Sequence, residues 1–368
     1  MIRRMAGAMG KRMGFILKDK EIFVGLEDSK RTWKLCVRSG GVVANETSMP
    51  ADYEALRNYF NNKFPGCRIR VMYEAGFGGF YLHDQLLADN WECVVTPPHT
   101  VTQEKCSRQK NDRIDCRRLA KNLENGDYRS CCVPDKELRE DRQISRTYGQ
   151  VQKDIVRVCN RIRRTLEFHG LDKLFPPGSW SGAAYKQLEQ KLEEMNISRS
   201  LEISFAVMFK ELENLRQLKK ELLLELRNLA KSDRYRQSVD LLKSAPGIGI
   251  LTAIRLALEW GDMSRFQRKE AFASFLGLIP SDYSSGEQDR RGHITKQGNR
   301  WVRSWLVEAA WRAIEHDPVL LDKFRRVFSH SGSKKKAIVA VARMLAMRLR
   351  RVLLDGKPYE NGLVSCCS

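Results

Sequence analysis

Residues 110–120 read KNDRIDCRRLA and place two aspartates, Asp112 and Asp115, beside an apolar helical stripe. The stripe follows the i, i+3, i+4, i+7 spacing of one helix face and consists of Cys116, Leu119, Ala120 and Leu123. Extended back by one turn, the same face carries both aspartates. Because burying even one unpaired carboxylate costs several kcal/mol, two acids on an inward-facing stripe indicate a bound cation.

Acidic residues also end two segments that have the pattern of strands. Residues 21–27 (EIFVGLE) are an apolar run that ends at Glu27 and is followed by Asp28. Residues 67–75 (CRIRVMYEA) deliver Glu74 just before a glycine. A single acid at a strand end is ordinarily a solvated cap, but acids at three such places are harder to explain in that way.

Metal-assisted phosphoryl transfer is the chemistry that suits such an acidic set. Mg²⁺ is a hard cation that takes oxygen ligands, and sharing it makes several carboxylates on one inward face favourable. Two such ions about 4 Å apart could flank a scissile phosphate, activate the attacking oxygen and stabilise the leaving one. The acids at these three places are therefore candidate Mg²⁺ ligands.

The elements before the aspartate helix are expected to be three strands, a helix, a strand, a helix and a strand. Alternating Trp33, Leu35 and Val37 and the Gly40-Gly41 turn predict two antiparallel strands after the first. The rest are a helix at 51–64, the strand at 67–75, a helix at 80–89 and a strand from Trp91 that Pro97-Pro98 stops. This order matches the ribonuclease-H-like (RuvC-like) α/β fold, which draws metal ligands from its first strand, fourth strand and a late helix.

Residues 137–232 are expected to be almost entirely helical, with a break at PPGSWSG (176–182). A heptad of leucines predicts either an antiparallel hairpin within the chain or an oligomer interface: Leu212, Leu215, Leu222, Leu226 and Leu229. From Leu241 a second helical domain begins, and LLKSAPGIGILTAIRLAL has the form of a helix-hairpin-helix. Its glycine turn could aim N–H groups at a phosphate or simply cap a helix, and the positive charge of the chain favours phosphate.

A second candidate site lies in the serine loop, within residues 275–311. Pro280 is expected to end a helix and Ser284-Ser285-Gly286 to form a turn, before a basic run of Arg290, Arg291, Lys296, Arg300 and Arg303. A Ser-Gly turn is ordinarily only a loop, and a basic run only a solvated face. Strand exchange without ATP, however, needs a covalent intermediate such as phosphoserine, with a serine activated by a base or metal and cations that neutralise the phosphate.

The composition limits the partners. Sixty-five Lys and Arg residues against 45 Asp and Glu residues give a formal charge of +20, which indicates a nucleic acid as partner. No apolar run reaches the roughly 18 residues of a membrane span, and MIRRMAGAMGKRMGFILKDK is interpreted as a flexible basic arm. Ten cysteines without a C-x-x-C pair predict reduced thiols in the cytoplasm, here beside the nucleoid.

Several motifs together resemble the DEDD transposases of insertion-sequence family 110, particularly its 1111 subgroup. They are GLEDSK, YEAG and KNDRIDCRRLA, and towards the C-terminus PGIGxxTA, FxGLIPSxxSSG and GHITKQGNR, in the expected order over about residues 21–350. The family is understood as recombinases guided by an element-encoded noncoding RNA, acting as tetramers on two DNA partners. The resemblance implies the tetrad Glu27, Glu74, Asp112 and Asp115 and a serine nucleophile in the S-G pair.

One position departs from the family, whose first acid is usually an aspartate where this chain has Glu27. Adjacent strand residues face opposite sides, so Glu27 and Asp28 cannot both point at one site, and we choose Glu27 with Asp28 as the alternative. Ser285 is the chosen nucleophile, with Ser284 as the alternative.

We therefore predict an α/β plus all-α protein: a basic arm (1–20), a RuvC-like DEDD domain (21–135), a helical coiled-coil region (136–235), a C-terminal serine transposase domain (236–355) and a tail (356–368). The expected function is RNA-guided DNA recombination through a phosphoserine, assisted by Mg²⁺. Expected partners are the guide RNA, donor and target double-stranded DNA and further copies of the chain, from dimer to tetramer, with no membrane. The alternatives are a metal-dependent endonuclease or junction resolvase, and a non-catalytic nucleic-acid-binding protein.

Overall fold

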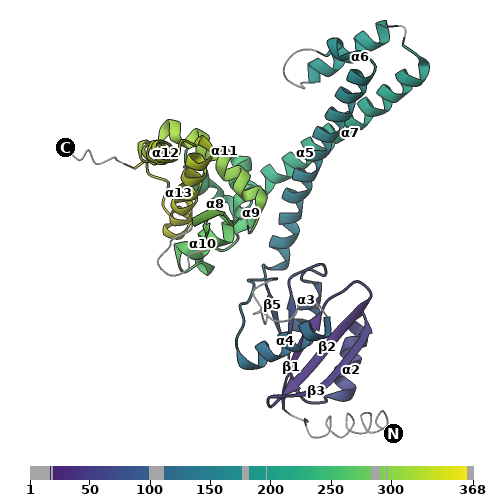
Figure 1. Ribbon diagram of the computed structural model, residues 1–368, viewed down its shortest axis with the longest axis vertical. Coiled ribbons are helices and arrows are strands. Elements are labelled where there is room, and N and C mark those ends of the chain that lie inside the picture. Colours follow the sequence, from purple (N-terminus) through teal and green to yellow (C-terminus); the bar gives the residue numbers. More distant parts are fainter. Residues whose placement is uncertain are drawn as a thin grey trace, which may run out of the picture. The chain divides into compact units, whose positions relative to one another are not determined.

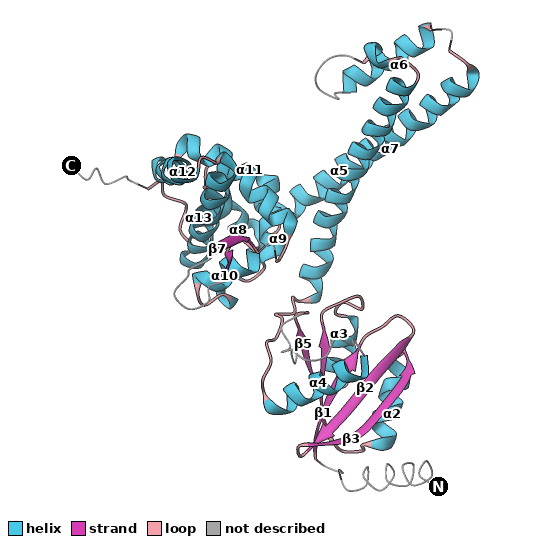
Figure 2. Cartoon of the chain, viewed as in Figure 1, coloured by secondary structure: helices cyan, strands magenta, loops and turns pink. Residues whose placement is uncertain are grey.

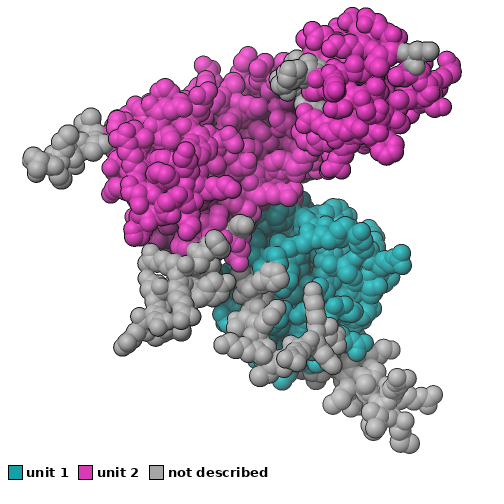
Figure 3. Space-filling view, turned by 45° about the horizontal axis from the view of Figure 1, so that its top comes forward, with its two compact units in different colours: residues 1–133 teal, residues 134–368 magenta. Residues whose placement is uncertain are grey.

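The computed structural model describes residues 17, 20–98, 112–175, 182–195, 197–282, 291–295 and 297–362. The chain divides into two compact units, residues 1–133 and 134–368 (Figure 3). Several predicted features lie outside the described residues: most of the basic arm, the Pro-Pro break at 176–181, and both serines of the serine loop. The described helices include none that is long and apolar enough to cross a membrane.

The first unit is built on a five-stranded sheet with the order β3-β2-β1-β4-β5 (Figures 1 and 2). β1 pairs antiparallel with β2 and parallel with β4, β2 pairs antiparallel with β3, and β4 pairs parallel with β5. The strands are β1 (Glu21–Glu27), β2 (Thr32–Ser39), β3 (Val42–Pro50), β4 (Arg68–Glu74) and β5 (Glu92–Thr96). The predicted order of strands and helices, with its five strands, is confirmed.

Among the described residues, three helices cover the two faces of this sheet: α2 (Tyr53–Lys63), α3 (Tyr81–Ala88) and α4 (Asp112–Asn125). Alternation along β1 sends Ile22, Val24 and Leu26 into the larger core with residues of α2 and α3. The intervening Phe23 packs with Leu119 and Leu123 of α4 on the opposite face. The apolar stripe predicted for the aspartate helix is therefore the surface by which α4 packs on the sheet.

Within its described residues, the second unit is helical apart from one short hairpin of strands (Figure 2). Its two longest helices, α5 (Lys136–Phe168) and α7 (Arg199–Lys231), pack side by side and antiparallel. Of the leucine heptad, Leu212 and Leu226 are buried and the other three are partly buried against the same cores. The apolar seam thus packs within the chain, as in the hairpin interpretation.

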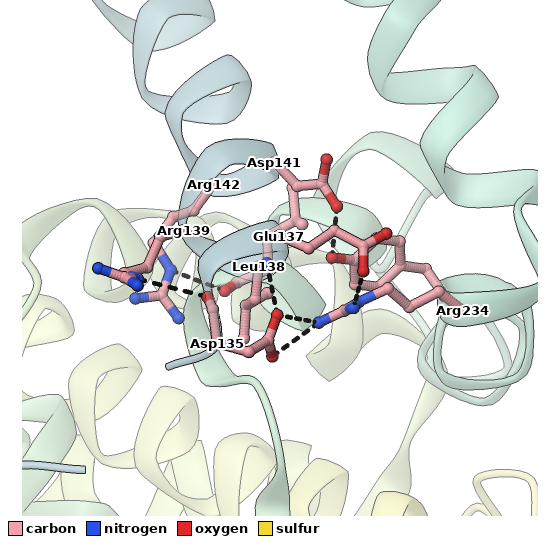
Figure 4. A network of polar contacts seen from close by, with 9 residues as sticks. Asp135, Glu137, Leu138, Arg139, Asp141, Arg142 and Arg234 are labelled. Atoms are coloured by element: carbon pink, nitrogen blue, oxygen red, sulfur yellow. Dashed lines mark hydrogen bonds and ion pairs between the residues drawn. The ribbon is translucent and has the colours of Figure 1, made fainter. Parts of the chain in front are cut away.

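The start of α5 is tied to α8 (Asp233–Lys243) by a polar network (Figure 4). Asp135 caps α5 by accepting from the Leu138 amide at 2.9 Å, and Arg234 of α8 donates to both Asp135 oxygens at 2.7 and 2.8 Å. Tyr235 donates to Asp141 Oδ2 at 2.6 Å. Asp135 therefore serves both as a helix cap and as an ion-pair partner.

Helix α9 (Ile250–Trp260) lies at the centre of the second core, with every residue from 253 to 260 buried. Its buried Glu259 accepts from Arg146 of α5 at 3.0 and 3.1 Å, and Arg142 Nε lies 3.7 Å from Glu259 Oε2. The remaining elements are the short η1 (Asp172–Leu174) and η2 (Met263–Arg265), α6 (Gly182–Glu194), α10 (Lys269–Leu276), α11 (Arg300–His316), α12 (Pro318–Ser331) and α13 (Lys334–Asp355).

The prediction that Pro280 ends a helix is wrong. Helix α10 already ends at Leu276, where Gly277 adopts the left-handed conformation with φ of 64°. Pro280 instead begins β6 (Pro280–Asp282), which pairs antiparallel with β7 (Arg291–Ile294). The segment that contains the two serines therefore joins the strands of a hairpin.

Candidate acidic site and serine loop

Strand alternation places Glu27 and Glu74 on the face of the sheet that α4 covers. In β1, Glu27 lies on the same face as Phe23 and Gly25, because the three occupy alternate positions. In β4, Glu74 lies on the same face as Met72, which packs against Leu119 and Leu123. Both glutamate residues are half-buried and lie at the ends of adjacent parallel strands.

Gly25 allows α4 to lie close to β1. A Cβ atom on Gly25 would stand 2.0 Å from the Cys116 carbonyl oxygen and 2.5 Å from the Ala120 nitrogen, both of them backbone atoms of α4. Only glycine permits this approach. The short distance between strand and helix brings the first turn of α4 to the acidic ends of the strands.

The two aspartates of α4 contact different cations. Lys34 of β2, which is the antiparallel partner of Glu27, forms an ion pair with Asp112. Arg118 Nη2 lies 2.9 Å from Asp115 Oδ1 and 3.7 Å from Glu74 Oε1. One guanidinium nitrogen therefore joins the helix acid to the fourth-strand acid.

Asp28, the alternative to Glu27, takes part in a different set of contacts. Its Oδ1 accepts from Trp33 Nε1 at 2.9 Å, and Trp33 belongs to the core on the α2–α3 side. Its Oδ2 is buried against Gly78 and has no hydrogen-bond partner in the described part of the chain. The contacts of Asp28 thus favour Glu27 as the residue that faces α4.

Two thiols, Cys36 and Cys116, lie beside the acids and pack against Ala120. Burial raises the pKa of Cys36 to about 11 and that of Cys116 to about 12. A metal ligand must be a thiolate, so neither group offers itself at neutral pH. A hollow of about 180 Å³ adjoins them, lined among others by Lys34, Glu46 and Arg113.

The donor chemistry of the site fits a hard divalent cation, because its four candidate ligands are all carboxylates. As they stand, no three His, Cys, Asp or Glu side chains among the described residues lie close enough to bind a metal ion. Glu74, Asp112 and Asp115 each contact Lys34 or Arg118. Each of these three carboxylates therefore has a cationic partner within the chain.

The serine loop can be described only at its two ends. Ser284, Ser285, Arg290 and Lys296 lie outside the described residues, and so does the side chain of Arg291. Arg303 donates to the carbonyl oxygens of Leu276 at 3.2 Å and Gly298 at 3.1 Å, so its guanidinium braces the base of the loop. Arg300 is exposed at the start of α11.

Two family models match the two regions of the chain that contain the acidic site and the serine loop. Residues 24–170, which contain all four acids, match a transposase model of the IS110 DEDD type, and residues 239–325 match the Transposase IS116/IS110/IS902 family. The chain belongs to this transposase family. The expected class of enzyme is thereby confirmed, and DEDD transposase domains typically use a divalent metal.

Three relatives illustrate the likeness. A Sinorhizobium fredii protein named as a transposase, y4rJ, is 28% identical, and the match covers 93% of this chain and 94% of the relative. The transposase for insertion sequence element IS1111A of Coxiella burnetii is 24% identical over 73% of each chain. The pilin gene-inverting protein of Moraxella lacunata is 30% identical over 37% of this chain and 42% of its own length.

Sequence reasoning missed the two cations of the site. Arg118 stands three residues after Asp115, and that spacing alone puts them on the same helix face. Lys34 could have been found from the register of the first hairpin, because it lies opposite Glu27.

Proposed function

We propose that this transposase is an RNA-guided DNA recombinase that cuts and rejoins DNA through Ser285, assisted by Mg²⁺ at the acidic site. The observation that carries the metal-dependent part is the shared face of Glu27, Glu74 and α4. Three elements far apart in the sequence deliver carboxylates to one side of one sheet. A protein that only binds nucleic acid gains nothing from acids there, since they repel its phosphates.

In the proposed reaction the Ser285 oxygen attacks a DNA phosphorus, and the bond from phosphorus to the leaving nucleoside oxygen breaks. The phosphoserine ester keeps the bond energy, and a hydroxyl of the second DNA strand then attacks it and releases Ser285. When bound, the divalent cation supplies positive charge that stabilises the phosphate and activates the attacking oxygen. The tetrad would hold that cation, and basic side chains beside the loop would neutralise the phosphate.

The proposed partners are the element's guide RNA and its donor and target DNA. The net charge of +20 suits polyphosphate ligands. One face of α5, here called the basic face, offers a binding surface for them and is lined by Arg157, Asn160, Arg161, Arg164, Thr165, Phe168 and His169. Phe168 is 85% exposed on this face, where it could stack on a base.

The alternative function is a metal-dependent endonuclease or junction resolvase in which Ser285 is structural. The relative that is named for inverting a pilin gene favours recombination, because inversion requires that DNA be rejoined as well as cut. A nuclease would instead leave free ends and form no covalent adduct.

The test is a search for the covalent adduct on a nicked or suicide DNA substrate quenched in denaturant. Wild type should give a protein–DNA band that maps to residues 281–291, and Ser285→Ala should bind nucleic acid normally yet give neither band nor recombinant. Asp112→Asn and Asp115→Asn should also lose the band while folding normally. A band that survives Ser285→Ala but not Ser284→Ala would move the nucleophile by one residue, and cleavage without any adduct would establish the nuclease instead.

A further inference from the structure

We propose that Arg118 is an internal counter-ion that competes with the divalent cation for Glu74 and Asp115. The inference rests on the proposed metal-binding role of the acidic site. It adds that the site has its own cation in the metal-free protein and that loading the site displaces this cation.

The contacts of Arg118 place its charge between two candidate ligands. Its Nη2 lies 2.9 Å from Asp115 Oδ1 and 3.7 Å from Glu74 Oε1, on two different elements. The exposed fractions are 21% for the arginine side chain, 29% for Glu74 and 16% for Asp115. Such partly buried charges are screened less than surface pairs, so their attraction is stronger than that of an exposed pair.

One nitrogen of the guanidinium is left without a partner in the described part of the chain. Arg118 Nε is buried and has no hydrogen-bond partner among the described residues. An unpaired buried N–H group is unfavourable, so the attraction to Glu74 and Asp115 must outweigh this cost in the present position. The attraction to the two carboxylates therefore contributes to holding the guanidinium where it lies.

A cation that bridged Glu74 and Asp115 would occupy the same place as the guanidinium. Both positive charges cannot remain there, because like charges within about 4 Å repel strongly in a partly buried site. Binding therefore requires the Arg118 side chain to turn away, and its lost ion pairs reduce the apparent affinity for the metal. Lys34 competes with the metal for Asp112 in the same way, but more weakly, since 48% of the Asp112 side chain is exposed.

The neighbouring Arg117 provides a matched control. It carries the same charge one residue earlier on α4, but it points to Glu46 of β3, with which it forms two hydrogen bonds. More than half of its side chain is exposed. Removing its charge changes the net charge of the unit as much as removing that of Arg118, without freeing Glu74 or Asp115.

The experiment is a Mn²⁺ titration of the full chain, purified free of nucleic acid, followed by the EPR signal of free Mn²⁺. Arg118→Gln should bind Mn²⁺ on the order of fivefold more tightly than wild type, which corresponds to about 1 kcal/mol of lost competition. Arg117→Gln should bind as wild type. The melting temperature of Arg118→Gln should be lower without metal and should rise further with Mn²⁺ than that of wild type.

The direction of the change decides the inference. Weaker binding in Arg118→Gln would mean that the arginine orients the carboxylates, and unchanged binding that it is a bystander; either result overturns the proposal. Arg118→Lys keeps the charge but loses the planar guanidinium, so its Mn²⁺ affinity should lie between those of wild type and Arg118→Gln. It replaces Arg118→Gln in the experiment if that variant does not fold. Mn²⁺ binding that persists in Asp112→Asn/Asp115→Asn, or that is absent from every variant, would overturn the metal site itself and the competition with it.

Discussion

At the scale of single residues, the acidic site depends on a position that carries no side chain. Gly25 lets the backbone of α4 rest directly on β1, and this contact sets how far Asp112 and Asp115 stand from Glu27 and Glu74. A methyl group there would meet backbone atoms, which cannot rotate away as a flexible side chain can. The helix itself would have to move.

We therefore expect Gly25→Ala to destabilise the first unit by about 3 kcal/mol and to abolish Mn²⁺ binding at the acidic site. Denaturant unfolding followed by circular dichroism and the Mn²⁺ titration measure the two effects. Gly76→Ala is the control, because the nearest atom to a Cβ there would be the Glu74 backbone carbonyl oxygen, at 3.7 Å. If Gly25→Ala kept its stability and its metal binding, α4 would not need its close contact with β1.

Part of the site could be predicted from sequence because alternation and helical spacing are local rules. They put Glu27 and Glu74 in the same strand phase as residues that face α4, and they put Asp112 and Asp115 on one helix face. The separate contacts of Asp28 depend on Trp33 and Gly78, which only the fold brings together. The same holds for the contact of Arg118 with Glu74, which joins a helix to a strand.

At the scale of elements, a cap joins three segments of the second unit. Asp317 lies at the start of α12, where its Oδ1 accepts from the Val319 and Leu320 amides at 2.9 and 3.1 Å. Its Oδ2 accepts from Arg348 of α13 and from Tyr359 beyond it, both at 2.6 Å. The carboxylate side chain is fully buried.

We expect Asp317→Ala to reduce the free energy of unfolding by about 2–4 kcal/mol, because it removes a cap and leaves Arg348 unpaired. Asp317→Asn keeps an acceptor for the helix amides and should be milder. Urea unfolding of the three proteins measures both changes.

The pH dependence follows from the pKa of Asp317. Burial alone would raise it, but the hydrogen bonds from Tyr359 and the helix amides and the charge of Arg348 hold it below its ordinary value of 3.8. A lowered pKa means that the carboxylate stabilises the fold above pH 3.8 and that this contribution is lost as the pH falls through the folded-state pKa. The difference in free energy of unfolding between wild type and Asp317→Asn should therefore be largest at pH 7 and shrink in acid. A difference that did not change with pH would exclude the ion pair as its cause.

The sheet of the first unit could be predicted element by element because its strands and helices carry strong periodic patterns. The β6–β7 hairpin could not, since Pro280 suggests a stop signal in sequence. Proline is tolerated at the first residue of a strand, and the actual stop is Gly277. In its left-handed conformation, Gly277 lies directly against the backbone of Gln297, and no local sequence pattern predicts this contact.

At the scale of the whole molecule, the acidic candidate site and the basic face of α5 belong to different units and have different proposed roles. The four acids of the candidate site lie in the first unit, whereas the basic face of α5 lies in the second. Its three arginines recur at helical spacing, and two of them form ion pairs at the surface, Arg157 with Asp154 and Arg161 with Glu211. Surface pairs of this kind are weak, so a phosphate can replace the carboxylates.

Binding through this face should be visible in the salt dependence of affinity. Each phosphate contact contributes about 0.7–0.9 to the slope of log K against log salt, so replacing Arg157, Arg161 and Arg164 by Gln should reduce the slope by about 2. The matched control replaces three exposed lysines of α6 and α7 that lie among glutamates, Lys186, Lys191 and Lys210. Fluorescence anisotropy with labelled single-stranded RNA and with duplex DNA of equal length measures the slopes, and the nucleic acid that shows the larger loss is the one that the face binds. If the lysine variant lost as much slope as the arginine variant, the affinity would come from the total charge of +20, and α5 would have no special part in it.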